Sequence, residues 1–349
     1  MIKATPWLHY SIWSLLFLLL NISPTDGWNH SQRKDKLKTS ADILTDAVNK
    51  GDFTAVKKGL QSGSVNARNS QGETALIVAT LKNDFEMVKY LLSIGANVNQ
   101  AIEPPTQRRS KKDDCDCPPI DVGATPLIYA RDQKIVRLLL DAGADVNART
   151  SDGDTALIRS SSKNREVIGD LLNAGANVNL QNTIGETALN SAVFNGRSDI
   201  LHMLLGAGAT VDTSDIGGYT ALIWAADNNH YEAVRVLLKF GANMNAANNG
   251  GYTGLILATV HGYQETVKVL IEAGVDLNIQ TKEKGYSALH IAALNGHEPV
   301  VETLLTAGAD TTLKTRNGET AFQIAERRNA ERRGFAGIVR LLQAASTRK

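Results

Sequence analysis

The residues best suited to chemistry are the only two cysteines, which form the sequence Cys115-Asp116-Cys117. Thiols tend to pair in an oxidising compartment, and a ring closed between such near neighbours is strained and easily reduced. Four interpretations are open: a local disulfide, free or intermolecular thiols, a soft-metal site assisted by Asp113, Asp114 and Asp116, or an incidental pair in a loop. Two sulfurs fall short of a closed metal site, and nothing else in the sequence supports thiol-redox chemistry.

Other stretches that resemble catalytic motifs are incomplete. His297-Glu298 begins like the zinc motif H-E-x-x-H, but Val301 stands where the second histidine belongs. Gly206-Ala-Gly208-Ala lacks the third glycine and the preceding strand of a dinucleotide-binding turn. The sequence has no phosphate-binding loop ending in Gly-Lys-Ser/Thr and no G-x-S-x-G nucleophile. We therefore expect no catalytic residue, no metal site and no cofactor, and a protein that is not an enzyme.

The elements that would position any site are repeats of one sequence unit. Each unit consists of a polar turn, Gly-x-Thr-x-Leu, an apolar stretch, Leu-Leu and Gly-Ala-Asn/Asp-x-Asn. The Thr or Ser of this unit recurs at Thr74, Thr125, Thr155, Thr187, Thr220, Thr253, Ser287 and Thr320. From Thr155 onward the steps are 32, 33, 33, 34 and 33 residues. Such a period is typical of a solenoid, in which each unit packs only on its neighbours.

The eighth unit shows the pattern most completely. It contains Ser287-Ala-Leu-His290-Ile-Ala-Ala, Gly296, a Leu-Leu pair and Gly308-Ala-Asp. This unit resembles the ankyrin repeat, a β-turn followed by two antiparallel helices, with the Thr or Ser hydroxyl at the first N-cap. The resemblance covers residues 41–345. It implies a mainly α-helical solenoid of about nine helix-turn-helix units with short β-turn fingers, over residues 40–346.

Several units depart from the pattern. In the third, 12 residues instead of 15 separate Leu127 from Leu139, so residues 130–133 must turn the chain without a glycine. The fourth has Arg159 and three serines in its apolar stretch, from which we expect weaker stacking, irregular curvature or a polar pocket. The first unit and the Arg-rich last unit have polar character that suits caps facing water.

Two further segments lie outside the repeats. Residues 100–122 interrupt the array with four prolines and runs of charge, which predicts a long loop insertion that carries both cysteines. Residues 1–27 combine Lys3, an apolar run over 11–20 and a polar break, which is typical of a secretory signal peptide cleaved near Trp28. An uncleaved membrane anchor is the alternative. Residues 28–39 are predicted to be a polar linker.

The distribution of charge argues against nucleic acid as a partner. The chain carries a net charge of +1, but residues 61–315 hold 21 Lys and Arg against 28 Asp and Glu, a net charge of −7. The basic residues gather instead at the two ends of the chain. A nucleic-acid-binding array would need a basic stripe along its length.

The resemblance implies a partner-binding surface, because the turn tips and first helices of ankyrin arrays line a concave face. The residue between Gly and Thr is Tyr219, Tyr252 and Tyr286 in three consecutive units. The residues of the first helices expected on the same side are Phe194, Asn195, Asp227, Asn228, Val260, His261, Leu294 and Asn295. Tyrosine flanked by asparagine is a composition that binding surfaces favour. The alternative is that these tyrosines pack across neighbouring turns.

Other conspicuous side chains have structural interpretations. His230, His290 and His297 lie at repeat positions where an ankyrin array uses histidine for hydrogen bonding. Trp224 falls on an apolar position of its predicted helix, which favours a place in the core.

The sequence therefore predicts a non-enzymatic protein–protein interaction module. The signal segment predicts action outside the cytoplasm, secreted or periplasmic, with a membrane link only if residues 1–27 are retained. The expected partner is another protein, bound through the concave face, and the chain is expected to be a monomer. The alternative function is a thiol-redox or metal-handling accessory protein that uses Cys115 and Cys117.

Overall fold

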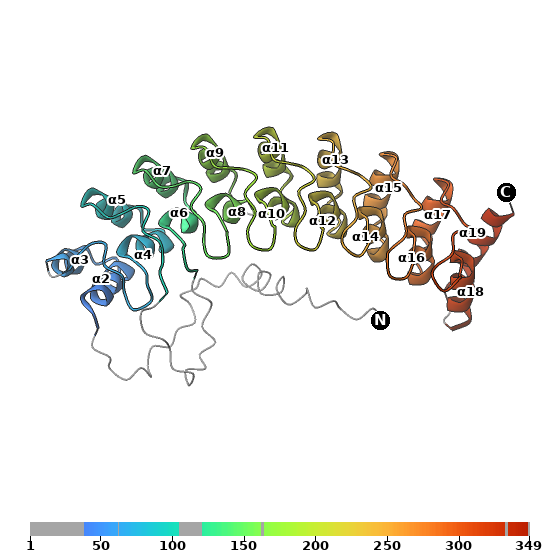
Figure 1. The fold of residues 1–349 in the computed structure, drawn as a ribbon, viewed down its shortest axis with the longest axis horizontal. Helices are drawn as coiled ribbons and strands as arrows, with labels where there is room; N and C mark the ends of the chain where they lie inside the picture. Colours follow the sequence, from blue (N-terminus) through green and yellow to red (C-terminus); the bar gives the residue numbers. More distant parts are fainter. Residues whose placement is uncertain (1–37, 62, 105–120, 162–163, 332–333, 348–349) are drawn as a thin grey trace. The chain divides into compact units, whose positions relative to one another are not determined.

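The computed structural model describes residues 38–61, 63–104, 121–161, 164–331 and 334–347. The chain divides into two compact units, Met1–Thr39 and Ser40–Lys349, and nearly all of the first lies outside the described residues. The predicted signal peptide, most of the polar linker, and Cys115 and Cys117 therefore stay predictions. The second unit is mainly α-helical, with 18 helices and no strand in its described part (Figure 1).

The 18 helices form nine consecutive pairs, as the repeat period predicts. The first helices are α2 (Ser40–Asn49), α4 (Ala75–Leu81), α6 (Pro126–Tyr129), α8 (Ala156–Ser160), α10 (Ala188–Phe194), α12 (Ala221–Asp227), α14 (Gly254–His261), α16 (Ala288–Asn295) and α18 (Ala321–Glu331). The second helices are α3 (Phe53–Leu60), α5 (Phe85–Ser93), α7 (Gln133–Asp141), α9 (Arg165–Asn173), α11 (Ser198–Gly206), α13 (Tyr231–Lys239), α15 (Gln264–Glu272), α17 (Glu298–Thr306) and α19 (Ala336–Ser346).

The pairs stack as two layers. Each first helix packs on the first helix of the next unit, and from α5 onward the second helices form a parallel row (Figure 1). The leucine of each Thr-x-Leu sequence fixes this stacking: Leu189, Leu222 and Leu255 are all almost fully buried. Burying such aliphatic side chains is the main stabilising contribution in a chain with few aromatic residues. The predicted solenoid is confirmed.

The repeated threonine begins the first helix of most units. The Thr220 hydroxyl accepts a hydrogen bond from the Ile223 N–H, and Thr74, Thr155, Thr187 and Thr253 act in the same way. Such an N-cap satisfies a backbone N–H that has no partner inside the helix. Thr125 is the exception. Pro126 follows it, and its buried hydroxyl makes no cap hydrogen bond.

The β-turns before the first helices, here called fingers, are joined to one another. The Ile216 N–H donates to the Ile184 carbonyl at 3.1 Å, and the Asn249 N–H donates to the Gly217 carbonyl at 3.0 Å. Gly218 shows why the pattern requires glycine: its φ is +78°, and an added Cβ would lie 2.8 Å from the Asn249 nitrogen. The fingers therefore form one hydrogen-bonded row along the first helices.

The terminal asparagines of the repeat make a second inter-unit row. The Asn147 Oδ1 accepts from the Asn177 N–H at 2.7 Å, and the Asn179 Oδ1 accepts from the Thr210 N–H at 2.8 Å. The Asn147 side-chain amide donates in turn to the Gly175 carbonyl at 3.3 Å. The Asn-x-Asn ending thus ties each loop to the next unit.

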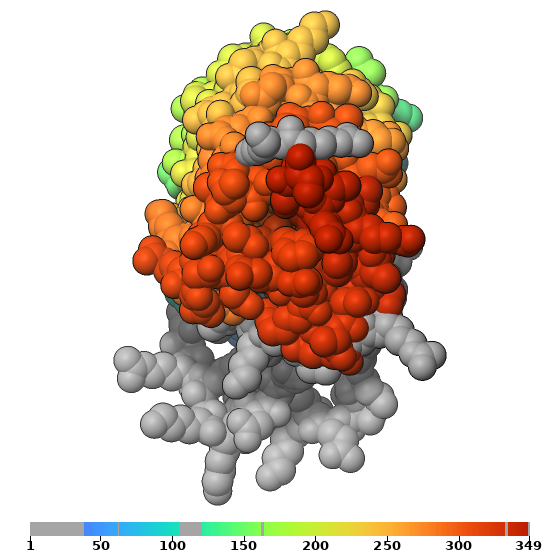
Figure 2. Space-filling model, turned by 90° about the vertical axis from the view of Figure 1, so that its right-hand side faces the viewer, coloured from blue at the N-terminus to red at the C-terminus, as the bar shows by residue number. Residues whose placement is uncertain are grey.

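The last unit closes the C-terminal end of the array, which Figure 2 shows face on. Arg328 donates to the Leu294 carbonyl of the preceding unit at 3.2 Å, and its guanidinium lies 5.6 Å from the centre of the Phe335 ring. Arg327 pairs with Glu319 at 3.0 Å and remains 44% exposed. These two arginines lie on the capping unit, as the sequence predicts.

The two ends of the insertion, at residues 102–103 and 121–124, are hydrogen-bonded to each other in the finger of the third unit. We call these residues the neck. The Ile102 N–H donates to the Ala124 carbonyl at 2.9 Å, and the Gly123 N–H donates back to the Ile102 carbonyl at 2.8 Å. Ile102 is buried, and Arg68 pairs with Glu103 at 2.8 Å. Residues 105–120, with both cysteines, lie outside the described residues. The neck preserves the finger geometry despite the inserted chain.

The two irregular units remain part of the stack. In the third, residues 130–132 turn the chain and the Asp132 carboxylate caps α7, so the predicted turn is confirmed except that Gln133 already belongs to the helix. In the fourth, α8 is short and Arg159 is held by Asp121 at 2.6 Å and Asp154 at 3.2 Å. Arg159 therefore links the fourth unit to the neck of the insertion.

Candidate functional site

The predicted tyrosines lie at the base of three consecutive fingers, immediately before α12, α14 and α16. Tyr219, Tyr252 and Tyr286 are each half-buried. The residues at the same position of the other fingers are Glu73, Ala124, Asp154, Glu186 and Glu319. The aromatic stretch is therefore confined to units six to eight.

Tyr219 packs on Trp224 of the same unit. Their ring centres are 4.7 Å apart with the planes tilted by 31°, and Phe194 of the preceding unit meets Trp224 edge-on at 5.7 Å. Trp224 is half-buried, and its indole N–H donates to the Asp215 carboxylate at 3.1 Å. The prediction that Trp224 belongs to the core is confirmed in part: its ring packs against the core, but it stays half-buried between the finger and the neighbouring helix, with its N–H paired.

Asp215 organises both the finger and the aromatic pair. Its Oδ1 accepts from the Gly217 N–H at 2.8 Å and the Tyr219 N–H at 2.9 Å, while its Oδ2 accepts from Trp224. One carboxylate thus shapes the turn and fixes the orientation of the indole. Three contacts, from Asp215, Tyr219 and Phe194, hold Trp224 in place before any partner binds.

Tyr252 and Tyr286 have different surroundings from Tyr219. Both pack against the edge of the hydrophobic core, and the Tyr286 ring lies 6.4 Å from that of His290. Burial, followed by the charge of Asp227, raises the pKa of Tyr219, so its phenol stays neutral. All three tyrosines are fixed by packing and keep part of their surface exposed. A role in partner binding stays a prediction.

The predicted residues at the ends of the first helices form a rim of mixed polar and apolar side chains. Phe194, Asn195, Asp227, Asn228, Val260 and Leu294 are half-buried, and His261 and Asn295 are exposed. His261 Nε2 lies 3.1 Å from the Asp227 carboxylate, and the His261 ring stacks on that of Tyr263 at 5.1 Å. The Asn295 amide donates to the Val260 carbonyl of the preceding unit at 3.0 Å. The structure therefore brings these residues together along one side of the first helices.

The fingers and first helices of units five to seven carry negative charge only. Residues 183–195, 214–228 and 247–261 contain Glu186, Asp215 and Asp227 and no lysine or arginine. Burial, with the charge of nearby Asp154 and Asp215, raises the pKa of Glu186 to about 7. Burial also raises the pKa of Asp227, against the opposing effect of His261. Glu186 and Asp227 are therefore partly dehydrated without a full positive counter-charge.

A family model of ankyrin repeats (three copies) matches the sequence over residues 10–102, 44–150, 108–182, 132–215, 189–281 and 255–346. The chain belongs to the ankyrin-repeat family. Ankyrin repeats generally mediate binding between proteins, and the family is generally non-enzymatic. A comparison with curated proteins finds no match.

The histidines of this ankyrin array have the predicted structural role. His230 Nε2 lies 3.3 Å from the Phe194 carbonyl, and His297 Nε2 lies 3.1 Å from the Val260 carbonyl, each in the preceding unit. His290 contacts the Ser287 hydroxyl at 2.7 Å and the Leu313 carbonyl at 3.0 Å. Burial lowers the pKa of His290, which keeps the ring neutral. These contacts connect successive units.

Three residues of the finger side were missed by the sequence analysis. Ile184 and Ile216 are 46% and 51% exposed at the tips of adjacent fingers, and Trp224 was placed in the core. Ile184 lies three residues before its capping threonine and Ile216 four, and an alignment of the fingers would have found both, because apart from Val122 the other residues at these two positions are polar or glycine. We define the finger-face patch as Ile184, Phe194, Ile216, Tyr219 and Trp224.

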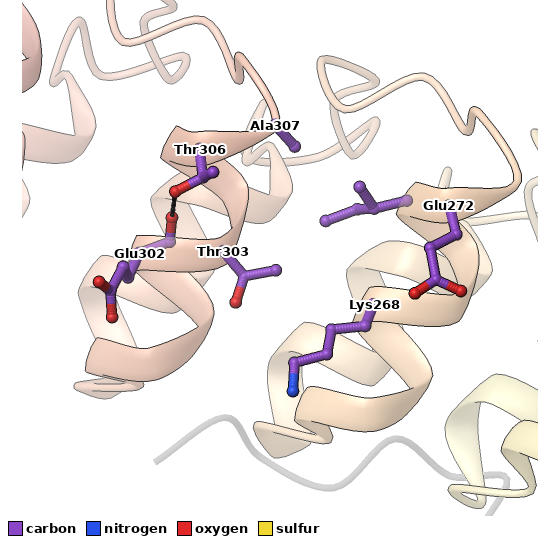
Figure 3. A pocket seen from close by; sticks show the side chains of 7 residues that line it. Lys268, Glu272, Glu302, Thr303, Thr306 and Ala307 are labelled. Carbon is purple, nitrogen blue, oxygen red and sulfur yellow. Dashed lines mark hydrogen bonds between the residues drawn. The ribbon is translucent and has the colours of Figure 1, made fainter.

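On the opposite, second-helix side, a shallow depression lies between α15 and α17. Figure 3 shows its lining, with Lys268 and Glu272 from α15 and Thr303 and Thr306 from α17. It is open to solvent. In the described part of the chain, no cluster of His, Cys, Asp or Glu is arranged to hold a metal, and no helix is long and apolar enough to span a membrane.

Proposed function

We propose that this ankyrin-repeat protein is a non-enzymatic module that binds a partner protein through the finger side of units five to eight. We further propose that it acts outside the cytoplasm after export directed by residues 1–27. The family's general role supports the first proposal. The apolar run followed by a polar break supports the second.

The observation that carries the binding proposal is the fixed aromatic pair, Tyr219 on Trp224, flanked by exposed Ile184 and Ile216. Interfaces are enriched in tyrosine and tryptophan because these rigid side chains give a large contact area at little entropic cost. Here the indole is already oriented by Asp215 and Phe194. A partner therefore meets an ordered apolar surface surrounded by a rim of mixed polar and apolar side chains.

Affinity capture from the extracytoplasmic fraction tests the binding proposal. The wild-type chain is compared with Tyr219→Ala/Tyr252→Ala/Tyr286→Ala, after circular dichroism has shown that the variant is folded. A matched control, Tyr231→Ala/Phe240→Ala, removes aromatic side chains that are about 40% exposed on the second-helix side. We expect the finger variant to lose a partner that the control retains. A folded triple variant that keeps every partner would refute the tyrosine prediction.

Fractionation tests the export proposal. We expect the mature protein to be extracytoplasmic, to lack residues 1–27 by mass spectrometry, and to wash off membranes in buffer. Retention of residues 1–27 with a membrane-bound protein would establish the anchor, and a cytoplasmic protein would contradict export altogether.

A further inference from the structure

We propose that the finger-face patch binds a protein segment that presents an arginine side chain among apolar residues. This inference rests on the proposed binding function and specifies the chemistry of the partner. The patch is apolar and ordered, and the fingers and first helices of units five to seven carry carboxylates only, although Arg149 of unit four reaches the Gln181 carbonyl beside them. A complementary segment must therefore supply both apolar surface and positive charge.

Three carboxylates lie around the aromatic pair. Asp215 contacts Trp224 directly, and Asp227 lies close enough to Tyr219 to raise the pKa of its phenol. Glu186 lies within electrostatic range of Asp215. The described residues provide no lysine or arginine that pairs with any of these three, although His261 contacts Asp227. An incoming cation would stabilise the Asp227 carboxylate, which His261 contacts, and would favour ionisation of Glu186. Asp215, in contrast, is already satisfied by three N–H donors.

The fourth unit shows what kind of cation suits this position. Arg159 lies four residues after Thr155, as Trp224 lies four residues after Thr220. In the fourth unit the guanidinium binds Asp121 through two nitrogens, at 2.6 and 2.7 Å, and lies 5.9 Å from the centre of the Tyr129 ring. The array thus already holds an arginine between carboxylates and an aromatic ring. Arginine suits such a place better than lysine, because its planar guanidinium pairs bidentately and stacks on rings.

The apolar part of the partner follows from the finger tips. Ile184 and Ile216 are about half exposed on adjacent fingers that are joined by a backbone hydrogen bond. Large exposed aliphatic side chains beside an aromatic pair favour a partner with apolar residues next to its charge. A neutral or acidic segment would cover Glu186 and Asp227 without supplying a positive charge.

Peptide selection on the immobilised full chain tests the proposal. A random dodecamer library displayed on phage is panned at low salt, and the enriched peptides are synthesised and measured by fluorescence anisotropy. Binding is compared between the wild type, Trp224→Ala and the isosteric double variant Glu186→Gln/Asp227→Asn. The control, Glu232→Gln/Glu302→Gln, removes two exposed carboxylates from the second helices.

We expect enriched peptides in which arginine stands beside aliphatic residues. Their Kd should rise about tenfold in the isosteric variant, rise further with salt, and change less than about twofold in the control. Peptides that need Trp224 but are acidic or uncharged would overturn the arginine inference and leave the binding function intact. If every enriched peptide binds all variants equally, or none is enriched, the patch is not a binding surface and both proposals fail.

Discussion

Units four and six fill the same space between finger and first helix with side chains of opposite character. In each, the residue directly before the capping threonine contacts the residue four positions after that threonine. In unit four this pair is Asp154 and Arg159, an ion pair with a 3.2 Å separation. In unit six it is Tyr219 and Trp224, two rings at 4.7 Å. The same backbone therefore holds either a salt bridge or an aromatic stack between finger and helix.

The two units differ in whether their carboxylates are paired with a cation of the array. Arg159 is saturated, because Asp121 and Asp154 bind its guanidinium and Asp121 also accepts from the Tyr129 hydroxyl at 3.1 Å. Unit six has the reverse arrangement, with carboxylates around rings and no cation. Unit five is intermediate, since Glu186 accepts a hydrogen bond from Ser191 at the corresponding pair of positions. The carboxylates of unit four are therefore paired with a cation inside the array, whereas those of unit six are not, which is why we propose unit six as the binding site.

The largest effect on stability is expected from removing the arginine of unit four. Arg159→Ala should lower the free energy of unfolding by about 3 kcal/mol, because it leaves Asp121 and Asp154 partly buried without their cation. The fall should be measured by urea denaturation. Arg137→Ala is the control, since Arg137 makes a similar two-nitrogen pair with Asp170 but is 60% exposed, and little change is expected. An equal loss in both variants would refute the structural role given to burial.

The stability of unit five, through Glu186, should depend on pH. The pKa of Glu186 is about 7 in the folded chain against 4.5 ordinarily, so folding favours its protonated form. Its contribution to stability is complete below about pH 4.5 and is lost as pH rises through 7. The wild type should therefore lose about 2.5 kcal/mol relative to Glu186→Gln between pH 5 and 8, measured by urea denaturation. Parallel pH profiles would show that Glu186 has an ordinary pKa.

Removing the aromatic member of unit six should have the next largest effect. Trp224→Ala should cost about 2 kcal/mol of unfolding free energy, through lost apolar burial and two lost ring contacts. Tyr231→Ala, on the exposed side of α13, should cost less than about 0.5 kcal/mol. A variant at Trp224 as stable as the control would show that the pair with Tyr219 contributes nothing to packing.

The smallest expected effect is a gain in stability within unit five. Asn190 is buried, and both polar atoms of its side chain lack a partner among the described residues. Units two, three, four, six and seven have isoleucine at this position. Asn190→Ile should therefore raise the thermal midpoint, by about 1 kcal/mol in unfolding free energy. A lower midpoint would mean that the amide makes a contact which isoleucine cannot replace.

Much of this architecture could be predicted from the repeat alone. Thr220 and its equivalents recur because they cap helices, and Gly218 recurs because its backbone has a positive φ. Trp224 and Arg159 could not be placed in this way. They occupy a half-buried position whose environment depends on the finger residue opposite. For Trp224 that residue is Tyr219, and for Arg159 the neck residue Asp121 also takes part. Periodicity identifies such a position but not its pairwise contacts.

Hydrogen–deuterium exchange of the captured complex tests the central claim most directly. With the partner bound, we predict slower exchange in residues 183–195, 214–228 and 247–261, and unchanged exchange in α11, α13 and α15. Protection confined to the second helices, or to the fingers of units two to four, would contradict the claim that unit six and its neighbours form the binding surface.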